Sequence, residues 1–76
     1  MDQKTLLLDC RGLNCPLPVL HIQKKIKTIK SGFEFKVYTT DPGSLNDIPA
    51  WAEFTNNKVL LINEKEDFYE FLLRKE

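Results

Sequence analysis

Cys15 directly precedes a proline-rich start to a segment whose apolar residues repeat with helical spacing; the surrounding run, residues 11–18, reads RGLNCPLP. Proline lacks an N–H and has φ fixed near the helical value, so Pro16 and Pro18 fit the first and third positions of a helix. A thiol at or beside the N-cap faces the positive end of the helix dipole, which favours an anion. The sequence therefore predicts that Cys15 is exposed and that its pKa is lowered, so that thiolate is present near neutral pH.

The residues around Cys15 admit a second interpretation. Free cysteines are often small buried apolar residues, and proline-rich helix starts occur without any chemistry. Arg11 is the cation nearest to Cys15 in sequence, and it either stabilises the thiolate or is an ordinary surface residue of the turn. Gly12 belongs to the same turn and is expected, with the prolines, to support the presentation of the thiol.

The other cysteine and the histidine indicate no second site. Cys10 is separated from Cys15 by four residues, unlike the two of a thioredoxin-like pair, and no further cysteines complete a zinc site. We expect Cys10 to be a small residue at a strand end. A disulfide switch is the alternative and requires the two Cα atoms to lie within ~7 Å. His21 is expected on a helix surface, and no metal site is predicted.

Four lysines give the first predicted helix a basic face: Lys24, Lys25, Lys27 and Lys30. Such a face usually serves solvation, and the alternative is a docking surface for an acidic partner or an RNA backbone, with Lys24 and Lys27 as candidate contacts. Trp51 is expected in the core or at its edge, because nothing basic flanks it.

Periodicity and turn residues predict the order βαβαββ. Strands are expected at Thr5–Leu8, Phe33–Thr40, Val59–Ile62 and Phe68–Leu73, and helices from Pro16 to Lys30 and from Asp41-Pro42 to Thr55. The first strand is broken by Asp9. The β-α-β passage implies a parallel pair and the last two strands an antiparallel hairpin. The predicted fold is an α/β two-layer sandwich, of the α+β kind, with a mixed four-stranded sheet and both helices on one face.

Side chains expected in the core follow from the same patterns. In the first helix they are Val19, Ile22, Ile26 and Ile29, with Leu20 widening the stripe; in the second strand Phe33, Phe35, Val37 and Thr39; and in the second helix Leu45, Ile48, Ala52 and either Trp51 or Phe54. Asp41 is expected as the N-cap of the second helix and Pro42 as its first residue. Pro49 falls inside that helix and predicts a kink.

Composition indicates one small domain over residues 1–76. The chain has 42% hydrophobic residues, and its eleven basic and eleven acidic residues cancel. A balanced charge gives no reason to expect tight nonspecific binding to nucleic acid or membranes. No apolar run approaches the ~18–20 residues of a membrane span, and no signal peptide is visible, so a cytoplasmic, reducing setting with two free thiols is expected.

Two motifs together resemble the small sulfur-carrier proteins of the TusA, SirA and YedF type. That family is marked by Cys-Pro-x-Pro after a strand ending in a Leu-Asp-x-x-Gly-like turn, which here reads LDCRGLNCPLP over residues 8–18. A second family-like stretch, DPGSLNDIPAW, covers residues 41–51, and the chain closes on FLLRK. The resemblance extends from Leu6 to Lys75 and implies the same fold.

The resemblance implies a carrier that accepts sulfane sulfur as a persulfide on Cys15, without metal or bound cofactor, and relays it to an acceptor. It implies a cysteine desulfurase or rhodanese-like donor and an acceptor pathway such as tRNA thiolation, molybdenum-cofactor supply or sulfur oxidation. Leu17 stands where tRNA-thiolating members carry an acidic residue, which counts against that branch. Some members also have a cysteine after the aromatic residue of the second helix, where this chain has Ala52 after Trp51, so no second relay thiol is expected there. The alternative is a non-catalytic regulatory or RNA-associated binding module of the same architecture.

Overall fold

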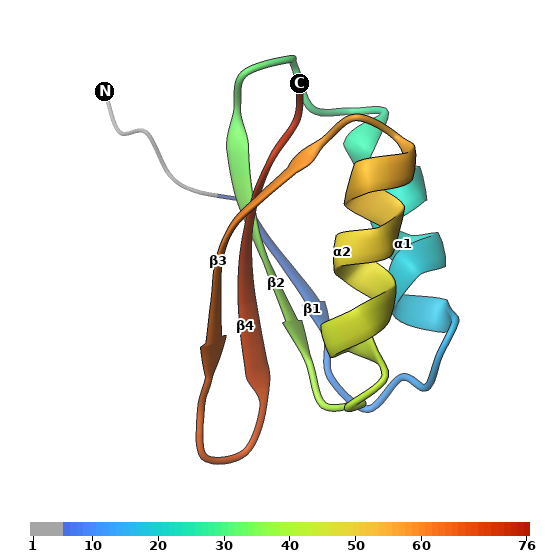
Figure 1. The fold of residues 1–76 in the computed structure, drawn as a ribbon, viewed down its shortest axis with the longest axis vertical. Coiled ribbons are helices and arrows are strands. Elements are labelled where there is room, and N and C mark those ends of the chain that lie inside the picture. Colours follow the sequence, from blue (N-terminus) through green and yellow to red (C-terminus); the bar gives the residue numbers. More distant parts are fainter. Residues whose placement is uncertain (1–5) are drawn as a thin grey trace.

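The computed structural model describes residues 6–76, which form four strands and two helices (Figure 1). In chain order these are β1 Leu6–Cys10, α1 Leu17–Ile26, β2 Glu34–Thr39, α2 Ser44–Phe54, β3 Lys58–Glu64 and β4 Tyr69–Arg74. The predicted order βαβαββ is confirmed.

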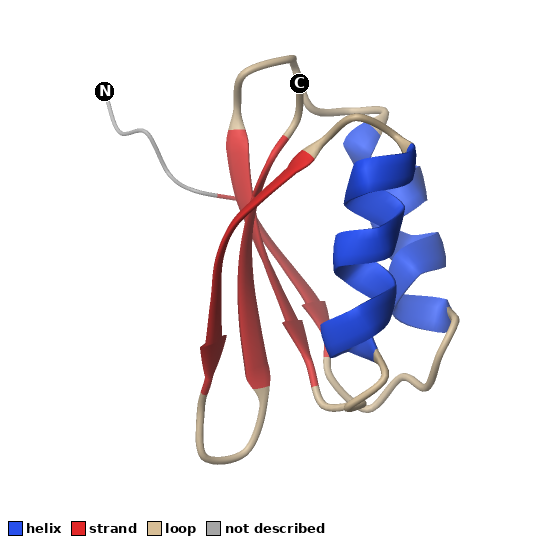
Figure 2. Cartoon of the chain, in the orientation of Figure 1, coloured by secondary structure: helices blue, strands red, loops and turns tan. Residues whose placement is uncertain are grey.

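The strands form one sheet in the order β1-β2-β4-β3. β1 pairs with β2 in parallel, whereas β4 pairs antiparallel with both β2 and β3. Both helices cover the same face of the sheet, as Figure 2 shows. The structure is therefore the predicted two-layer sandwich with a mixed sheet.

The core lies between the sheet and the helices. Alternation along β2 directs Phe35, Val37 and Thr39 inward, opposite Phe71 and Leu73 of β4. The helices contribute Ile22, Ile48, Trp51 and Ala52, and Ile29 follows α1 in the core. Burial of one face of each strand and one stripe of each helix is what holds the two layers together.

Some residues expected in the core lie outside it. Leu20 is 47% exposed, because it is two residues from the buried Ile22 and so points about 200° away around the helix. Trp51 is buried and Phe54 is 87% exposed, which decides between these two alternatives. Phe33 precedes β2 and is exposed, so its predicted inward position is wrong.

The helices are shorter than the periodicity indicates. α1 ends at Ile26 rather than Lys30, because turn bonds follow it: Thr28 N–H donates to Lys25 O (2.9 Å), and the Thr28 hydroxyl donates to the same carbonyl (2.7 Å). α2 begins at Ser44 with Gly43 as N-cap, so the predicted capping role of Asp41 is wrong. Pro49 lies inside α2, and the kink stays a prediction.

Strand ends also differ by one or two residues. β1 continues through Asp9 to Cys10, because both residues pair with β2, and its predicted start at Thr5 lies outside the described residues. β3 is longer than predicted at both ends, and β4 is shifted by one residue toward the C-terminus.

Three connections lie at one end of the sheet. The β1–α1 loop, the β2–α2 loop and the β3–β4 hairpin all lie at the lower end of Figure 1. Parallel strands end at the same edge, which is why the loops after β1 and β2 come together. Within residues 6–76, neither helix is long and apolar enough to cross a membrane.

Candidate functional site

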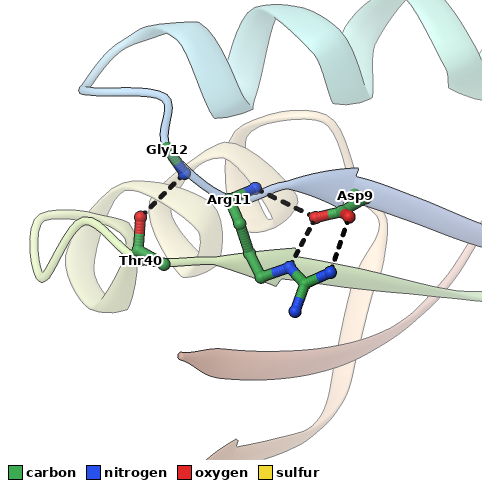
Figure 3. Close-up of polar contacts among 4 residues, drawn as sticks. All are labelled: Asp9, Arg11, Gly12 and Thr40. Carbon is green, nitrogen blue, oxygen red and sulfur yellow. Dashed lines mark hydrogen bonds and ion pairs between the residues drawn. The ribbon is translucent and has the colours of Figure 1, made fainter. Parts of the chain in front are cut away.

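The loop after β1 is held to the end of β2 through Gly12. Its N–H donates to Thr40 Oγ1 at 2.9 Å, as Figure 3 shows. Gly12 has φ of 85°, a left-handed conformation that side chains rarely adopt, so this turn requires glycine. The same turn is closed by Leu13 N–H donating to Cys10 O at 3.2 Å.

Cys15 follows this loop and precedes α1 by two residues. Pro16 is the N-cap, joined to Cys15 by a cis peptide bond, and Leu17 and Pro18 are the first two helical residues. The prolines therefore occupy the cap and the second position rather than the predicted first and third. Pro18 is buried and fixes the helix start, while Cys15 is exposed, in agreement with the sequence prediction.

Two carboxylates from the β2–α2 segment hold Cys15. The Cys15 N–H donates to Asp41 Oδ2 at 2.8 Å, and the Cys15 thiol donates to Asp47 Oδ2. Asp47 lies in the first turn of α2, and Asp41 Oδ1 also accepts the N–H of Gly43 (3.4 Å). Both the backbone and the side chain of Cys15 are thus fixed by acidic residues distant in sequence, Asp41 of the β2–α2 loop and Asp47 of α2. Sequence reasoning missed Asp47 and gave Asp41 a capping role.

These carboxylates raise the pKa of the Cys15 thiol above its usual value, so the predicted lowering is wrong. The hydrogen bond to Asp47 is the main cause, followed by partial loss of solvent and the negative charges of Asp47 and Asp41. The helix start offers few free donors to offset them, since Pro16 and Pro18 have no N–H and Leu17 N–H donates to Asn14 O at 2.8 Å. The thiol is therefore mostly protonated at neutral pH.

Arg11 is not brought to the thiol. Its guanidinium forms two hydrogen bonds of 2.9 Å with the Asp9 carboxylate (Figure 3), and its Cζ lies 5.5 and 5.3 Å from the ring centroids of Tyr38 and Phe68. The pairing lowers the pKa of Asp9. Arg11 therefore ties the β1 end to the hairpin side of the sheet, and these contacts favour the second of its two interpretations, a surface residue of the turn.

Cys10 is buried at the end of β1, opposite Thr39 of β2, and belongs to the core. Burial, with a smaller contribution from the Asp9 charge, raises the pKa of its thiol to about 11. Both cysteines are free thiols. These observations agree with the expectation that Cys10 is a small residue at a strand end.

A shallow groove of about 380 Å³ runs along α1 beside the site. Its lining consists of Leu17, Leu20, His21, Gln23, Lys24 and Lys27. Leu17 and Leu20 are exposed apolar side chains, and the two lysines are exposed at its basic end. His21 lies on the helix surface, as predicted. Within residues 6–76, no three His, Cys, Asp or Glu side chains are grouped so that they could hold a metal ion.

Comparison with known proteins places this architecture in one family. The family model described as sulfurtransferase TusA matches residues 7–75. The sulfur carrier protein TusA of Allochromatium vinosum is 41% identical over 68 residues, which cover 90% of each chain. The TusA sulfur carrier of Buchnera aphidicola is 38% identical over 69 residues, covering 91% of this chain and 87% of the relative.

A solved structure shows the same fold. The SirA-like protein from Desulfitobacterium hafniense superposes with a TM-score of 0.81 at 21% sequence identity, covering 95% of this chain and 100% of the other. At that identity the likeness establishes the fold alone.

The turn at Gly12 is tested by substitution, with the second positive-φ glycine, Gly32, as the control. Gly12→Ala should destabilise the protein by about 1–2 kcal/mol, because φ is positive there. Gly32→Ala should cost a similar amount, since Gly32 has φ of 91° far from the site. Chemical denaturation measures both. Only Gly12→Ala should raise the rate at which Cys15 reacts with iodoacetamide, because its loop carries the thiol; equal rates in the two variants would contradict this account.

Proposed function

The chain belongs to the TusA family of sulfur carriers, and we propose that Cys15 accepts sulfane sulfur from a donor protein as a persulfide and passes it to an acceptor. The observation that carries the proposal is the difference in exposure between the two cysteine thiols of the chain. Cys15 is exposed within the Cys-Pro-x-Pro motif, whereas Cys10 is buried in the core. Of the two, only Cys15 can meet a sulfur atom presented by another protein.

The transfer balances without an oxidant, a reductant or a bound cofactor. The Cys15 sulfur, once deprotonated, attacks the outer sulfur of the donor persulfide and forms a new S–S bond. The S–S bond of the donor breaks, and its inner sulfur leaves as a thiolate that takes up the proton lost by Cys15. The same exchange in reverse, with an acceptor thiolate as nucleophile, unloads the carrier.

The partners that this reaction requires are a persulfide-bearing donor, such as a cysteine desulfurase or a rhodanese-like protein, and an acceptor protein. We propose that the donor docks along the α1 groove, which starts two residues after Cys15. The groove combines exposed apolar surface from Leu17 and Leu20 with the charges of Lys24 and Lys27. It fits a partner surface with an apolar contact and an acidic rim.

Loading tests the function directly. Incubation with a cysteine desulfurase, pyridoxal phosphate and free cysteine should add sulfur to the intact mass, removable by reductant and located on the peptide containing Cys15. Cys15→Ser should fold and gain none, and Cys10→Ala should load nearly as well as the wild type, because Cys10 serves packing. Circular dichroism checks that both variants fold.

If several desulfurases and rhodaneses leave the wild type unloaded, the carrier proposal fails, and the binding-module alternative takes its place. Loss of loading in a folded Cys10→Ala variant would instead support a disulfide switch between the two cysteines.

Charge reversal tests the docking groove. The double variant Lys24→Glu/Lys27→Glu should slow sulfur transfer from the protein donor several-fold and weaken its dependence on ionic strength. Stopped-flow or quenched-flow transfer kinetics measure the effect. Lys30→Glu/Lys58→Glu is the matched control, since it changes the net charge equally at exposed lysines outside the groove. Equal slowing by both double variants would mean that overall charge, and not the groove, determines the transfer rate.

A further inference from the structure

Sulfur transfer as proposed above uses Cys15 but assigns no part to the carboxylate that holds its thiol. We infer that Asp47 is a specificity-determining residue: its carboxylate keeps the Cys15 thiol protonated and oriented until a donor protein places a cationic group against it. The part of this inference in which a donor frees the thiol from Asp47 rests on the proposed function. The restraint itself is a property of the free protein.

The geometry of the restraint involves two anchors on one segment. Asp47 Oδ2 accepts the Cys15 thiol proton, and Asp41 Oδ2 accepts the Cys15 N–H at 2.8 Å. Asp47 is itself fixed, because it belongs to the first turn of α2 and its N–H donates to Gly43 O at 2.9 Å. The thiol therefore points at a carboxylate on a rigid element, and ionisation of Cys15 removes that hydrogen bond.

The charge near the thiol is uncompensated by the chain. Among residues 6–76, the ion pairs join Arg11 to Asp9, Lys36 and Lys65 to Glu70, and Arg74 to Glu76, so none involves Asp41 or Asp47. The Cys15 thiolate would stand against two carboxylates with no cation of its own. A cationic group from outside would pair with Asp47 and remove the main obstacle to forming the nucleophile.

Selectivity follows from this arrangement. Small electrophiles and oxidants react with thiolate rather than thiol, and a neutral one brings no charge to displace Asp47. A donor protein whose persulfide lies beside a lysine or arginine brings both the sulfur and the charge. Asp47 thus favours loading by such a donor over reaction with small molecules in solution.

The restraint is tested on the free protein with iodoacetamide, a neutral probe that needs no sulfur donor. Asp47→Asn should be alkylated at Cys15 several-fold faster than the wild type at pH 7.5, and the midpoint of its pH–rate profile should move to lower pH. Asp47→Glu, which keeps the carboxylate, should stay close to the wild-type rate. Asp67→Asn is the matched control, because it removes one carboxylate from the exposed β3–β4 loop. An Asp47→Asn rate equal to or below that of Asp67→Asn overturns the inference.

The proposed cationic group of the donor is tested by measuring the rate of sulfur transfer from a loaded cysteine desulfurase to Cys15 at several ionic strengths. Added salt should slow the wild type more than Asp47→Asn, because the variant has lost one of the charge pairs. Equal salt dependence overturns the part of the inference that concerns the donor. If Cys15 never loads, the proposed function fails, while the alkylation result still decides whether Asp47 restrains the thiol.

Discussion

The parallel pairing of β1 with β2 is the constraint on which the rest of the site depends. Its register runs from Leu6 opposite Phe35 to Cys10 opposite Thr39, so both strands end at the same edge of the sheet. Each strand is followed by a helix, and the two connecting loops therefore leave side by side. The Gly12–Thr40 bond ties the loops at their bases, and the contacts of Asp41 and Asp47 with Cys15 join them farther along.

This juxtaposition determines the chemistry of the thiol. A cysteine before a helix is normally considered activated, because unpaired N–H groups and the helix dipole favour thiolate. Here prolines at the N-cap and second position remove two of those donors, while the β2–α2 loop and the first turn of α2 each supply one carboxylate. These two carboxylates outweigh the helix start. On the proposed role of Asp47, the Cys15 thiol is accessible and yet reacts slowly until a partner changes the charge around it.

Local signals in the sequence predicted the element order, the two-layer fold, the exposure of Cys15 and the position of Cys10 at a strand end. They failed where contacts between residues distant in sequence determine the surroundings of Cys15. Asp41 and Asp47 are 26 and 32 residues from Cys15, so helical spacing and capping preference could not reveal that they contact it. Arg11 is close in sequence to Cys15, but its planar guanidinium pairs with Asp9 instead. The stretch DPGSLND, residues 41–47, did contain a signal for this contact. It follows β2, and β2 ends at the same edge of the sheet as β1.

The central claim, that two carboxylates keep the Cys15 thiol protonated, is tested most directly by NMR. The ¹³Cβ shift of Cys15 is followed against pH in the folded protein and in an unfolded peptide of residues 11–18. The account predicts that the folded protein titrates at higher pH than the peptide, whose thiol should have an ordinary pKa of ~8.5. A midpoint in the folded protein at or below that of the peptide would contradict it.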